Sequence, residues 1–479
     1  MSRILNIRKY NSLNEDLIRE YNLHRGSGAK ELICYVPFRM MYFAFNGEVI
    51  ACCHNRSHIL GVYPKQSIKK IWFGSKIKKL RKYIKNNDLD YGCYVCKDQI
   101  MSKNFAAAKS KMYDHYPIPK NKYPSVMEFE LDNTCNLECI MCTGLFCSLI
   151  RKNLENKELV KSPYDSKFVN QLTKFIPYLE EAKFYGGEPF LIKIYYDIWE
   201  KMIEINPSIK FMIQTNGTVL NDKIKNILNK GFFNINISID SVNKENYELI
   251  RKNADFDRVM ENIKYFHEYC KDRNTFFSII PTPIRQNWQD LPGLINFCNN
   301  LQVPVYFNTL IYPYKNALWN LAPEKLTEIY DYLSKTQLPE NTENEKQNKI
   351  VFTDFLNQII AWKNENIIKF KDKDKNLIAL NEKLNEAKNI FISNLNIRLS
   401  KDLKNNKEKV SQKLNFYENL VNSKVNNLLP VEFQYIIYFE LNKLKMDDML
   451  KVLENNKFDN IIENTMSTFQ ELENNNYYL

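Results

Sequence analysis

The strongest constraint on the fold of this chain is a regular alternation of short apolar runs with longer amphipathic stretches. The apolar runs are VMEFEL (126–131), AKFY (182–185), IKFMIQ (209–214), NINISI (234–239), TFFSII (275–280) and VPVYFN (303–308). Helical patterns lie between them, near residues 166–181, 190–205, 221–230, 255–272 and 288–301. Strands that alternate with helices pair in parallel through right-handed crossovers. The pattern therefore predicts an α/β fold, a partial (β/α)6 barrel of the TIM type, with its chemistry at the C-terminal ends of the strands.

The least common residues of this segment fall at those predicted strand ends. Cys135, Cys139 and Cys142 follow the first strand with the spacing C-x3-C-x2-C. The motifs that follow the next three strands are GGEP (186–189), TNGT (215–218) and SIDS (238–241). Glycine accounts for only 12 of the 479 residues, so an adjacent glycine pair at a strand end indicates a place where the backbone approaches a ligand closely.

Composition indicates the cellular compartment of the protein and the chemistry of its cysteines. A chain of 479 residues that is 44% hydrophobic can bury a large core, in two or three domains. No N-terminal stretch resembles a signal peptide and no apolar run is long enough for a membrane span, so we expect a cytoplasmic protein without a membrane partner. The 11 cysteines lie mostly in two groups. In a reducing compartment such groups indicate metal or redox chemistry rather than disulfides.

The net charge of +11 is concentrated in one segment. Residues 61–125 contain 15 Lys and Arg but only 4 Asp and Glu, so this segment accounts for the whole excess. A basic surface attracts acidic peptides, phosphate-bearing molecules or RNA, but an ordinary solvated lysine-rich surface has the same composition. We favour the solvated surface. As a partner we expect an acidic or phosphorylated peptide or small molecule rather than a nucleic acid.

Residues 126–312 resemble the radical SAM enzymes, because the three cysteines and the GGEP, TNGT and SID segments occur in that family's order. The resemblance implies that three thiolates bind three irons of a [4Fe–4S] cluster and leave the fourth iron to S-adenosylmethionine (SAM). It also implies that an electron from the cluster cleaves SAM to a 5′-deoxyadenosyl radical, which abstracts a hydrogen atom from a substrate. The alternative for this loop is a zinc site with Cys147 as its fourth ligand.

The same resemblance implies a set of SAM-binding residues. The positions that match the family's contacts are Gly186, Gly187, Glu188, Asn216, Ser238, Asp240 and Arg251. The GGE residues correspond to contacts with the amino group of SAM, the SID residues to contacts with its ribose, and the arginine to a contact with its carboxylate. An ordinary surface arginine is the alternative for Arg251. No residue can be assigned as a catalytic acid or base for the substrate.

A second cysteine group precedes the predicted barrel. Its features in chain order are Cys34, a hairpin turn at Asn46-Gly47, the pair Cys52-Cys53 and the motif Cys93-x2-Cys96. Through its GEVIACC, SIKKIW, LRKYI and CYVC sequences this segment resembles the SPASM and twitch domains, which hold auxiliary iron–sulfur clusters. Such domains more often follow the barrel, and their N-terminal position here resembles that of the N-terminal-twitch subgroup.

The resemblance implies that Cys34, Cys52, Cys93 and Cys96 hold one auxiliary [4Fe–4S] cluster that transfers electrons, with Cys53 as the alternate for Cys52. Full SPASM domains carry cysteines for two clusters, whereas this segment has enough for one. Structural zinc is the alternative, since four thiolates suit zinc equally well. His54 and His58, which follow the Cys52-Cys53 pair, are interpreted as solvated side chains rather than ligands.

The expected organisation is an auxiliary-cluster domain at 1–120, the barrel at 121–320 and a helical extension at 321–479. We expect a radical SAM enzyme that takes electrons from a reductant such as flavodoxin or ferredoxin. Its substrate, for which a peptide is one candidate, and its outcome (oxidation, crosslinking or epimerisation) are not specified by the fold. The alternative is a non-catalytic binding module, stabilised by zinc or a cluster, that docks RNA or a protein partner.

Overall fold

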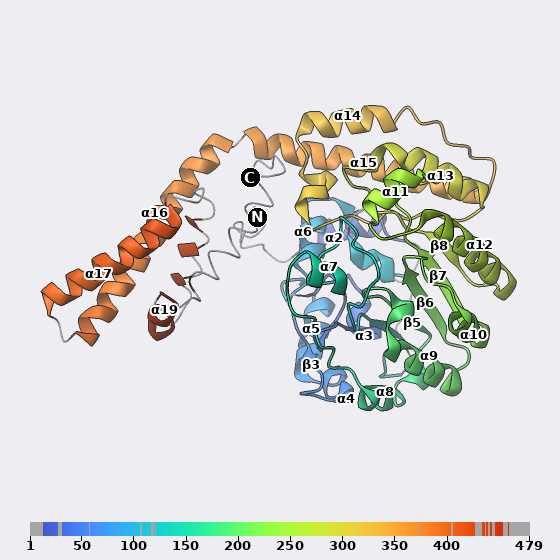
Figure 1. Ribbon diagram of the computed structural model, residues 1–479, viewed down its shortest axis with the longest axis horizontal. Coiled ribbons are helices and arrows are strands. Elements are labelled where there is room, and N and C mark those ends of the chain that lie inside the picture. The colour runs from blue at the N-terminus through green and yellow to red at the C-terminus, as the bar shows by residue number, and fades with distance from the viewer. Residues whose placement is uncertain are drawn as a thin grey trace. The chain divides into compact units, whose positions relative to one another are not determined.

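The computed structural model (Figure 1) describes most of the chain up to residue 426. The described residues are 13–26, 31–56, 58–105, 108–115, 119, 121–371, 373–403, 406–426, 434–435, 437–438, 441–442, 446–453 and 458, with the backbone alone for 368–371, 373–379, 446–448 and 451. The chain divides into two compact units, one formed by 1–318 and 328–361 and the other by 319–327 and 362–479. None of the described helices is long and apolar enough to cross a bilayer.

One sheet organises the first unit, with the strand order β3-β2-β1-β4-β5-β6-β7-β8. The strands are β1 (Met40–Phe43), β2 (Glu48–Ile50), β3 (Gly61–Val62), β4 (Val126–Phe129), β5 (Glu181–Phe184), β6 (Lys210–Thr215), β7 (Phe232–Ile237) and β8 (Phe277–Ile279). Strands β4 to β8 pair in parallel, and Ile279 continues the series with a parallel bridge to Val305. The predicted partial barrel is confirmed, although its sixth strand is reduced to this bridge.

Most of the helices between the strands lie close to the predicted stretches. They are α7 (Ser148–Asn153), α8 (Ser166–Leu172), α9 (Lys193–Ile205), α10 (Asp222–Lys230), α11 (Lys244–Ile250), α12 (Phe256–Arg273) and α13 (Leu291–Asn300). Figure 1 shows α9, α10 and α12 on one side of β5 to β8. The helix predicted at 166–181 stops at Leu172, and a 3-10 turn that begins with Ile176 and Pro177 follows. Helices α7 and α11 were not predicted.

A row of aromatic rings crosses the helix-covered face of the sheet. Phe129 stacks on Phe43 and Phe184 with centroid distances of 5.4 and 4.9 Å, and Phe211 stacks on Phe233 at 4.5 Å. These five side chains come from five adjacent strands, β1, β4, β5, β6 and β7, and all are fully buried. The row therefore runs continuously from the N-terminal strand into the barrel.

The N-terminal cysteine-rich segment is joined to the barrel through the sheet itself. The predicted hairpin turns at Gly47, whose φ of 85° is in the left-handed region. Its first strand, β1, pairs in parallel with β4 over four residues, a pairing that the sequence did not predict. The helices of this segment are α2 (Glu15–Leu23), α3 (Val36–Arg39), α4 (Ile68–Trp72), α5 (Ser75–Lys85) and α6 (Tyr94–Met101).

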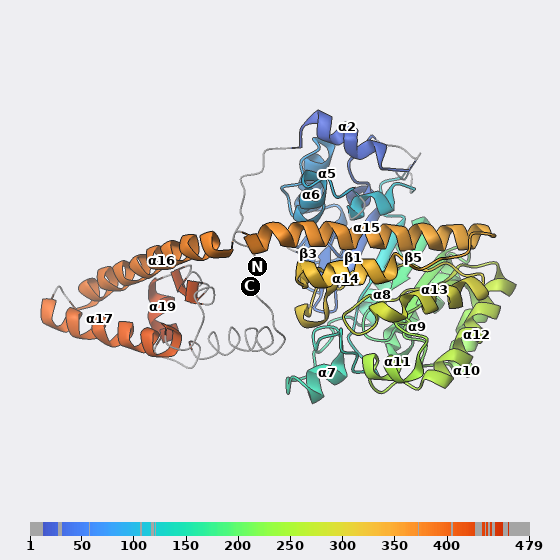
Figure 2. The ribbon, with the colours of Figure 1, turned by 90° about the horizontal axis from the view of Figure 1, so that it is seen from above.

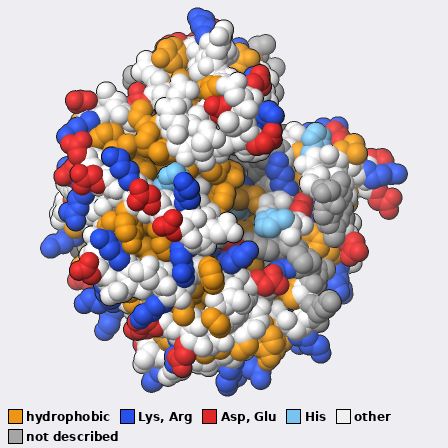
Figure 3. Space-filling model, turned by 90° about the vertical axis from the view of Figure 1, so that its right-hand side faces the viewer, with side chains coloured by type: hydrophobic (Ala, Val, Ile, Leu, Met, Phe, Trp, Pro, Cys, Tyr) orange, Lys and Arg blue, Asp and Glu red, His pale blue; other side chains and the backbone are white. Residues whose placement is uncertain are grey.

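Five of the 15 basic residues of the segment 61–125 lie on the solvent face of α5. That helix buries Ile77, Leu80 and Ile84, whereas five lysines on it are exposed, namely Lys76, Lys78, Lys79, Lys82 and Lys85. On the face of the molecule shown in Figure 3, Lys and Arg side chains lie interspersed with Asp and Glu. The amphipathic pattern of α5 thus accounts for part of the local charge excess by ordinary solvation.

The predicted C-terminal extension is helical. Its helices are α14 (Pro323–Leu333), α15 (Glu343–Lys371), α16 (Lys373–Asp402), α17 (Lys407–Val421) and α19 (Met446–Leu453). In the second unit α16 and α17 pack side by side, as both ribbon views show (Figures 1 and 2). Leu384, Ala387 and Phe391 recur at three-four spacing and form part of the buried face of α16.

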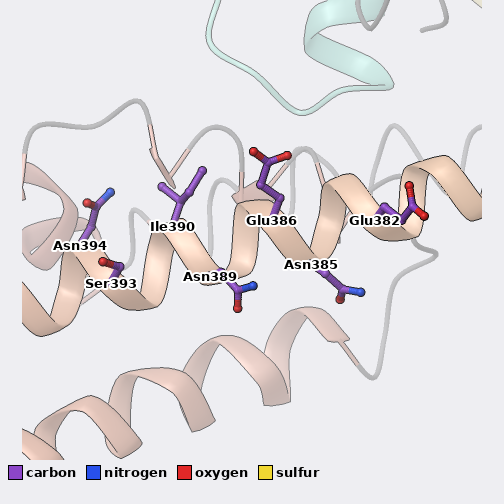
Figure 4. A pocket seen from close by; sticks show the side chains of 7 residues that line it. All are labelled: Glu382, Asn385, Glu386, Asn389, Ile390, Ser393 and Asn394. Atoms are coloured by element: carbon purple, nitrogen blue, oxygen red, sulfur yellow. The ribbon is translucent and has the colours of Figure 1, made fainter.

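An open surface hollow of about 730 Å³ lies along α16. It is lined by Glu382, Asn385, Glu386, Asn389, Ile390, Ser393 and Asn394. Figure 4 shows Glu386 and Ile390 on one side of the helix and Asn385 and Asn389 on the other. None of its lining residues is a cysteine, so the hollow is separate from the sites considered below.

Candidate active site and auxiliary metal centre

The three-cysteine loop follows β4 and is fixed to the segment after α11. The backbone amides of Glu138 and Ile140 donate to the carbonyls of Lys252 and Ile250, at 3.0 and 2.9 Å. Arg251 lies between those two acceptors in the chain. The fold thus brings Arg251 to the cysteine loop, although more than 100 residues separate them in sequence.

A fourth thiol contacts this loop. Cys147 is buried, donates to the carbonyl of Leu137 at 3.0 Å and shares hydrogen bonds with Cys135 and Cys142. These bonds, followed by burial, raise the pKa of both Cys135 and Cys142, while burial raises the pKa of Cys139 to about 11. Buried thiols of this kind lose their protons when a bound metal supplies positive charge. The thiol-rich donor set fits a cluster of several irons, whereas these thiols do not lie close enough together in this structure to hold a single zinc ion.

The two glycines after β5 pack against the backbone of the cysteine loop. A Cβ atom at Gly187 would lie 2.0 Å from the carbonyl oxygen of Thr134, and one at Gly186, whose φ is +92°, would lie 2.4 Å from that of Asp132. The amide of Glu188 donates to the Thr134 carbonyl at 2.7 Å. The close approach that the glycines permit in this structure is therefore between two loops of the protein, where the sequence suggested an approach to a ligand.

Glu188 links the GGEP segment to the TNGT segment. Its carboxylate accepts from the Thr215 hydroxyl (2.8 Å), the Asn216 amide (2.8 Å) and the Phe190 amide (3.1 Å). The side chain is completely buried. Burial raises the pKa of this carboxyl to about 7, against the opposing effect of the hydrogen bonds. In this arrangement Glu188 holds two strand-end loops together.

The raised pKa of Glu188 predicts a pH-dependent stability. The folded carboxyl, with a pKa of about 7, binds its proton more tightly than the unfolded one, whose ordinary value is 4.5. Its stabilising contribution is therefore complete below pH 4.5 and falls by about 1.4 kcal/mol for each pH unit as the pH rises toward 7.

We expect Glu188→Gln, which cannot ionise, to lose this fall between pH 5 and 7. Denaturant unfolding at several pH values measures it, with the exposed Glu204→Gln as the control. Parallel pH profiles for the wild type and Glu188→Gln would contradict the expectation.

Asp240 and Arg251 form an ion pair in the interior. The Arg251 Nε lies 2.7 Å from the Asp240 Oδ2, and the other carboxylate oxygen accepts from the Thr282 amide at 2.7 Å. Burial alone would lower the pKa of Arg251, but the charges of Asp240 and Cys139 outweigh it and raise that pKa. Arg251 is thus a buried residue with a charge partner, not a surface arginine.

Asn216 and Ser238 complete the group at the strand ends. The Asn216 side-chain amide donates to Asn136 Oδ1 at 3.0 Å and lies 4.0 Å from the Cys135 sulfur. Ser238 is half-buried directly after β7, and its amide donates to the Thr215 carbonyl at 3.0 Å. The residues that match the SAM contacts therefore gather around the loops at one end of the barrel, as expected for strand-end residues of a parallel sheet.

The auxiliary cysteines line one cavity. Its lining residues are Cys34, Val36, Pro37, Ala51, Cys52, His54, Asn55, Leu89, Cys93, Cys96, Lys109, Ser110 and Tyr113. Cys52 follows β2, and Cys93 and Cys96 lie at the start of α6, so a strand end and a helix end bring the thiols together. His54, interpreted as solvated from the sequence, lines the same cavity, and burial lowers its pKa to about 4. No regular spacing marks it in the sequence.

The auxiliary thiols are surrounded by hydrogen-bond donors. The Asn55 side chain donates to the Cys93 sulfur at 3.4 Å, and Ser110 donates to Cys96 from both its backbone and its hydroxyl. Burial raises the pKa of Cys93 to about 12, and burial with the neighbouring thiols raises that of Cys52 strongly. Across the described residues, no three His, Cys, Asp or Glu side chains lie close enough together to hold a single metal ion. The four cavity thiols therefore fit a cluster of several irons rather than a single ion, and metal binding would compensate the charge of the buried thiolates.

Cys53 faces away from the cavity. It packs against the cluster of Tyr42, Ala44 and Ile50 and is absent from the cavity lining. Burial raises its pKa to about 12, and the nearest charges are those of barrel residues and of the loop after Cys53 rather than those of the cavity thiols. The two adjacent cysteines are thus distinguished by their surroundings.

Comparison with known proteins places these segments in two families. Residues 130–298 match the family model described as the radical SAM superfamily, and residues 34–97 match that of an iron–sulfur cluster-binding domain, SPASM. The chain therefore carries a radical SAM domain in residues 130–298 and a SPASM domain in residues 34–97. Both matches fall on the segments whose motifs carried the resemblance, so the radical SAM and SPASM identifications are confirmed. They support a [4Fe–4S] cluster and SAM in the radical SAM domain.

Several curated relatives of this chain are named as GTP 3′,8-cyclases or probable GTP 3′,8-cyclases. It is 26% identical over 239 residues to a probable GTP 3′,8-cyclase of Methanocaldococcus jannaschii, covering 48% of this chain and 70% of the relative. It is 28% identical over 183 residues to an uncharacterized protein of Archaeoglobus fulgidus, covering 38% and 42%. The chain thus spans less than half of the Archaeoglobus protein.

Solved structures with likeness to this chain include one described with bound AdoMet and one described with a bound precursor peptide. One is described as anSMEcpe with bound AdoMet, with a TM-score of 0.34, 19% identity, and coverage of 43% of this chain and 58% of that chain. Another is Streptococcus suis SuiB bound to the precursor peptide SuiA, with a TM-score of 0.34, 16% identity, and coverage of 54% and 58%.

Proposed function

We propose that this chain reductively cleaves SAM to a 5′-deoxyadenosyl radical that abstracts a hydrogen atom from a substrate. The observation that carries the proposal is the position of the three-cysteine loop. It lies inside the radical SAM match and is fastened to the Arg251 segment and to the GGE loop at one end of the barrel. A loop held this way keeps a metal and its ligand in a fixed geometry, which is the protein's share of cofactor chemistry.

In this proposal Cys135, Cys139 and Cys142 hold the SAM-binding [4Fe–4S] cluster. When bound, the cluster supplies the electron that splits the sulfonium bond of SAM. Gly186 and Gly187 set the distance between the cysteine loop and the GGE loop, since any Cβ would collide with the loop backbone.

The remaining SAM-site residues have supporting roles in the proposal. Glu188 holds the TNGT loop in place, so Asn216 stays beside the Cys135 sulfur. Asp240 orients Arg251 for the carboxylate of SAM, and Ser238 contacts the ribose.

The auxiliary site is proposed to hold a second [4Fe–4S] cluster through Cys34, Cys52, Cys93 and Cys96. Support comes from the common cavity of these four thiols and from the SPASM match, which covers all of them. With all four ligands from the protein, no position stays open for a substrate, which suits electron transfer. Cys53 lies outside the cavity, which favours Cys52 as the ligand.

A peptide is the proposed substrate, with flavodoxin or ferredoxin as the electron donor and the cytoplasm as the location. We also propose three functional segments with boundaries at residues 120 and 320. Residues 1–120 bind the auxiliary cluster, residues 121–320 generate the radical, and residues 321–479 form a helical extension.

The test is anaerobic purification and reconstitution of the full chain with iron and sulfide. Iron, sulfide and zinc are assayed together with 5′-deoxyadenosine formation from SAM under dithionite. We expect about eight irons per chain and reductant-dependent 5′-deoxyadenosine. Bound zinc without iron, together with no cleavage of SAM, would contradict the proposal and favour a zinc-stabilised binding module.

Two single variants test the auxiliary ligand assignment. Cys52→Ala should lose about four irons per chain, whereas the neighbouring Cys53→Ala should keep them. Loss of iron from Cys53→Ala alone would reverse the assignment.

A further inference from the structure

The concave face of the sheet, opposite the aromatic row, carries charged side chains. Side chains alternate between the two faces of a strand, so Phe129 packs among the helices while Glu130 points to the concave side. Tyr42 of the neighbouring β1 lies on the same side, because its hydroxyl donates a hydrogen bond to the Glu130 carboxylate. The end of β4 therefore places a carboxylate next to the cysteine loop that begins five residues later.

Arg56 reaches this carboxylate from the auxiliary segment, three residues after Cys53. Its Nη2 donates to Glu130 at 2.8 Å and to the Tyr42 hydroxyl at 3.2 Å, and its Nη1 lies 3.4 Å from the other Glu130 oxygen. The guanidinium carbon is 5.4 Å from the ring centroid of Tyr42 and 5.5 Å from that of Phe146. Phe146 belongs to the chain that follows the three cysteines. Arg56 is thus braced by the auxiliary segment, the barrel and the cysteine loop together.

The two members of this ion pair differ sharply in exposure. The Glu130 side chain is 8% exposed, whereas that of Arg56 is 40% exposed. A guanidinium has five N–H donors, and the three bonds above use three of them. Among the described residues, no acceptor is assigned to the Arg56 Nε. The pair therefore offers a fixed, solvent-reachable cation whose counter-ion is buried.

The charges nearby favour a carboxylate over a phosphate as the ligand of this cation. On the same face, Lys183 lies 3.6 Å from a Glu128 oxygen and 3.7 Å from a Glu181 oxygen, so that cation already faces two carboxylates. Glu130 offsets much of the charge of Arg56. Such a surface repels a doubly charged phosphate more than a singly charged carboxylate. The Glu130 and Tyr42 bonds already use the paired N–H groups of the guanidinium, so the Nε–H would donate a single charge-assisted hydrogen bond to a ligand carboxylate.

We propose that Arg56 is a substrate-binding residue that anchors a carboxylate of the substrate at the mouth of the barrel. This inference rests on the proposed function and narrows its substrate to molecules with a carboxylate, either an acidic side chain or a peptide C-terminus. The position suits the role, since the anchored group lies between the auxiliary cavity and the three-cysteine loop.

The test measures binding of four small probes to the reconstituted full chain by ligand-observed NMR. N-acetyl-aspartyl amide represents an acidic side chain and N-acetyl-glycine a C-terminus. N-acetyl-asparaginyl amide is the neutral control, and N-acetyl-phosphoseryl amide tests phosphate. We expect at least one carboxylate probe to bind about tenfold more tightly than the asparaginyl probe. Whichever carboxylate probe shows the preference identifies the source.

The variants separate recognition from folding. Arg56→Gln leaves a buried Glu130 carboxylate without its partner, so the charge-balanced Arg56→Gln/Glu130→Gln is measured beside it. Both should lose the carboxylate preference, and Arg56→Lys should keep part of it. The exposed Lys65→Gln, which removes one charge from the neighbouring basic segment 61–125, should behave as the wild type.

Three results would overturn the inference: no carboxylate preference in the wild type, a preference that survives in the double variant, or tighter Arg56-dependent binding of the phosphoseryl probe. Probe binding does not require radical chemistry. Failure of the proposed function, seen as absent SAM cleavage by the wild type, is therefore distinguishable from failure of this inference.

Discussion

Replacing Cys135, Cys139 and Cys142 together by alanine is expected to abolish 5′-deoxyadenosine formation and to lower bound iron by about four atoms per chain. The reason is structural as well as chemical. The three thiols belong to one loop whose backbone is fastened to Ile250 and Lys252, and no other described thiols except Cys147 lie in that loop. Iron analysis and product quantification after reconstitution measure both effects.

The matched control uses two buried cysteines that belong to neither the three-cysteine loop nor the auxiliary cavity. Cys270 and Cys298 lie in α12 and α13 and are fully buried, so their removal changes packing without touching the loop. Cys270→Ala and Cys298→Ala should retain iron and cleavage. Undiminished cleavage in the triple variant would show that the loop is not the SAM-cleaving centre. Four remaining irons with cleavage lost would localise the second cluster to the auxiliary cavity.

Phe129→Ala should lower the free energy of unfolding by about 3–5 kcal/mol, the usual effect of removing a buried aromatic ring. Phe129 is completely buried, and its ring stacks on neighbours from both adjacent strands, Phe43 at 5.4 Å and Phe184 at 4.9 Å. The cavity would therefore open between β1 and β5. Denaturant unfolding monitored by fluorescence and circular dichroism measures the change.

Phe232 provides the comparison for Phe129. It begins β7 but is 42% exposed, so Phe232→Ala removes the same number of atoms with little cavity and should cost far less. The Phe129 variant should also weaken iron retention by the auxiliary cysteines, because β1 leads into the hairpin that carries Cys52. If Phe129→Ala and Phe232→Ala lowered the free energy of unfolding equally, the aromatic row would not be the main packing contact between β1 and the barrel.

The barrel could be predicted because its information is local. Each strand is a short apolar run, each helix an amphipathic stretch, and the alternation of the two specifies parallel pairing. The pairing of β1 with β4 is different, since Met40–Phe43 has no sequence mark that selects a partner more than 80 residues away. A hairpin turn at Gly47 predicts the neighbour on one side only.

The candidate sites were likewise predictable as positions and not as contacts. Spacing placed the cysteines, the glycines and Asp240 at strand ends, where a parallel sheet gathers them. It did not reveal that the Glu188 carboxylate is hydrogen-bonded to the Thr215 loop or that Arg56 forms an ion pair with Glu130. Such pairs depend on side-chain direction between distant segments, which no periodicity encodes.

The shared sheet also imposes an order on the synthesis of the protein. Roughly 80 residues separate β1 from β4, so the ribosome makes β1 about 4 to 16 seconds before its partner strand exists. By the time β4 is made, Cys34, Cys52, Cys93 and Cys96 have all been synthesised, while β1 still lacks its parallel neighbour. The four thiols proposed to hold the auxiliary cluster thus exist before the strand that completes the sheet beside their hairpin.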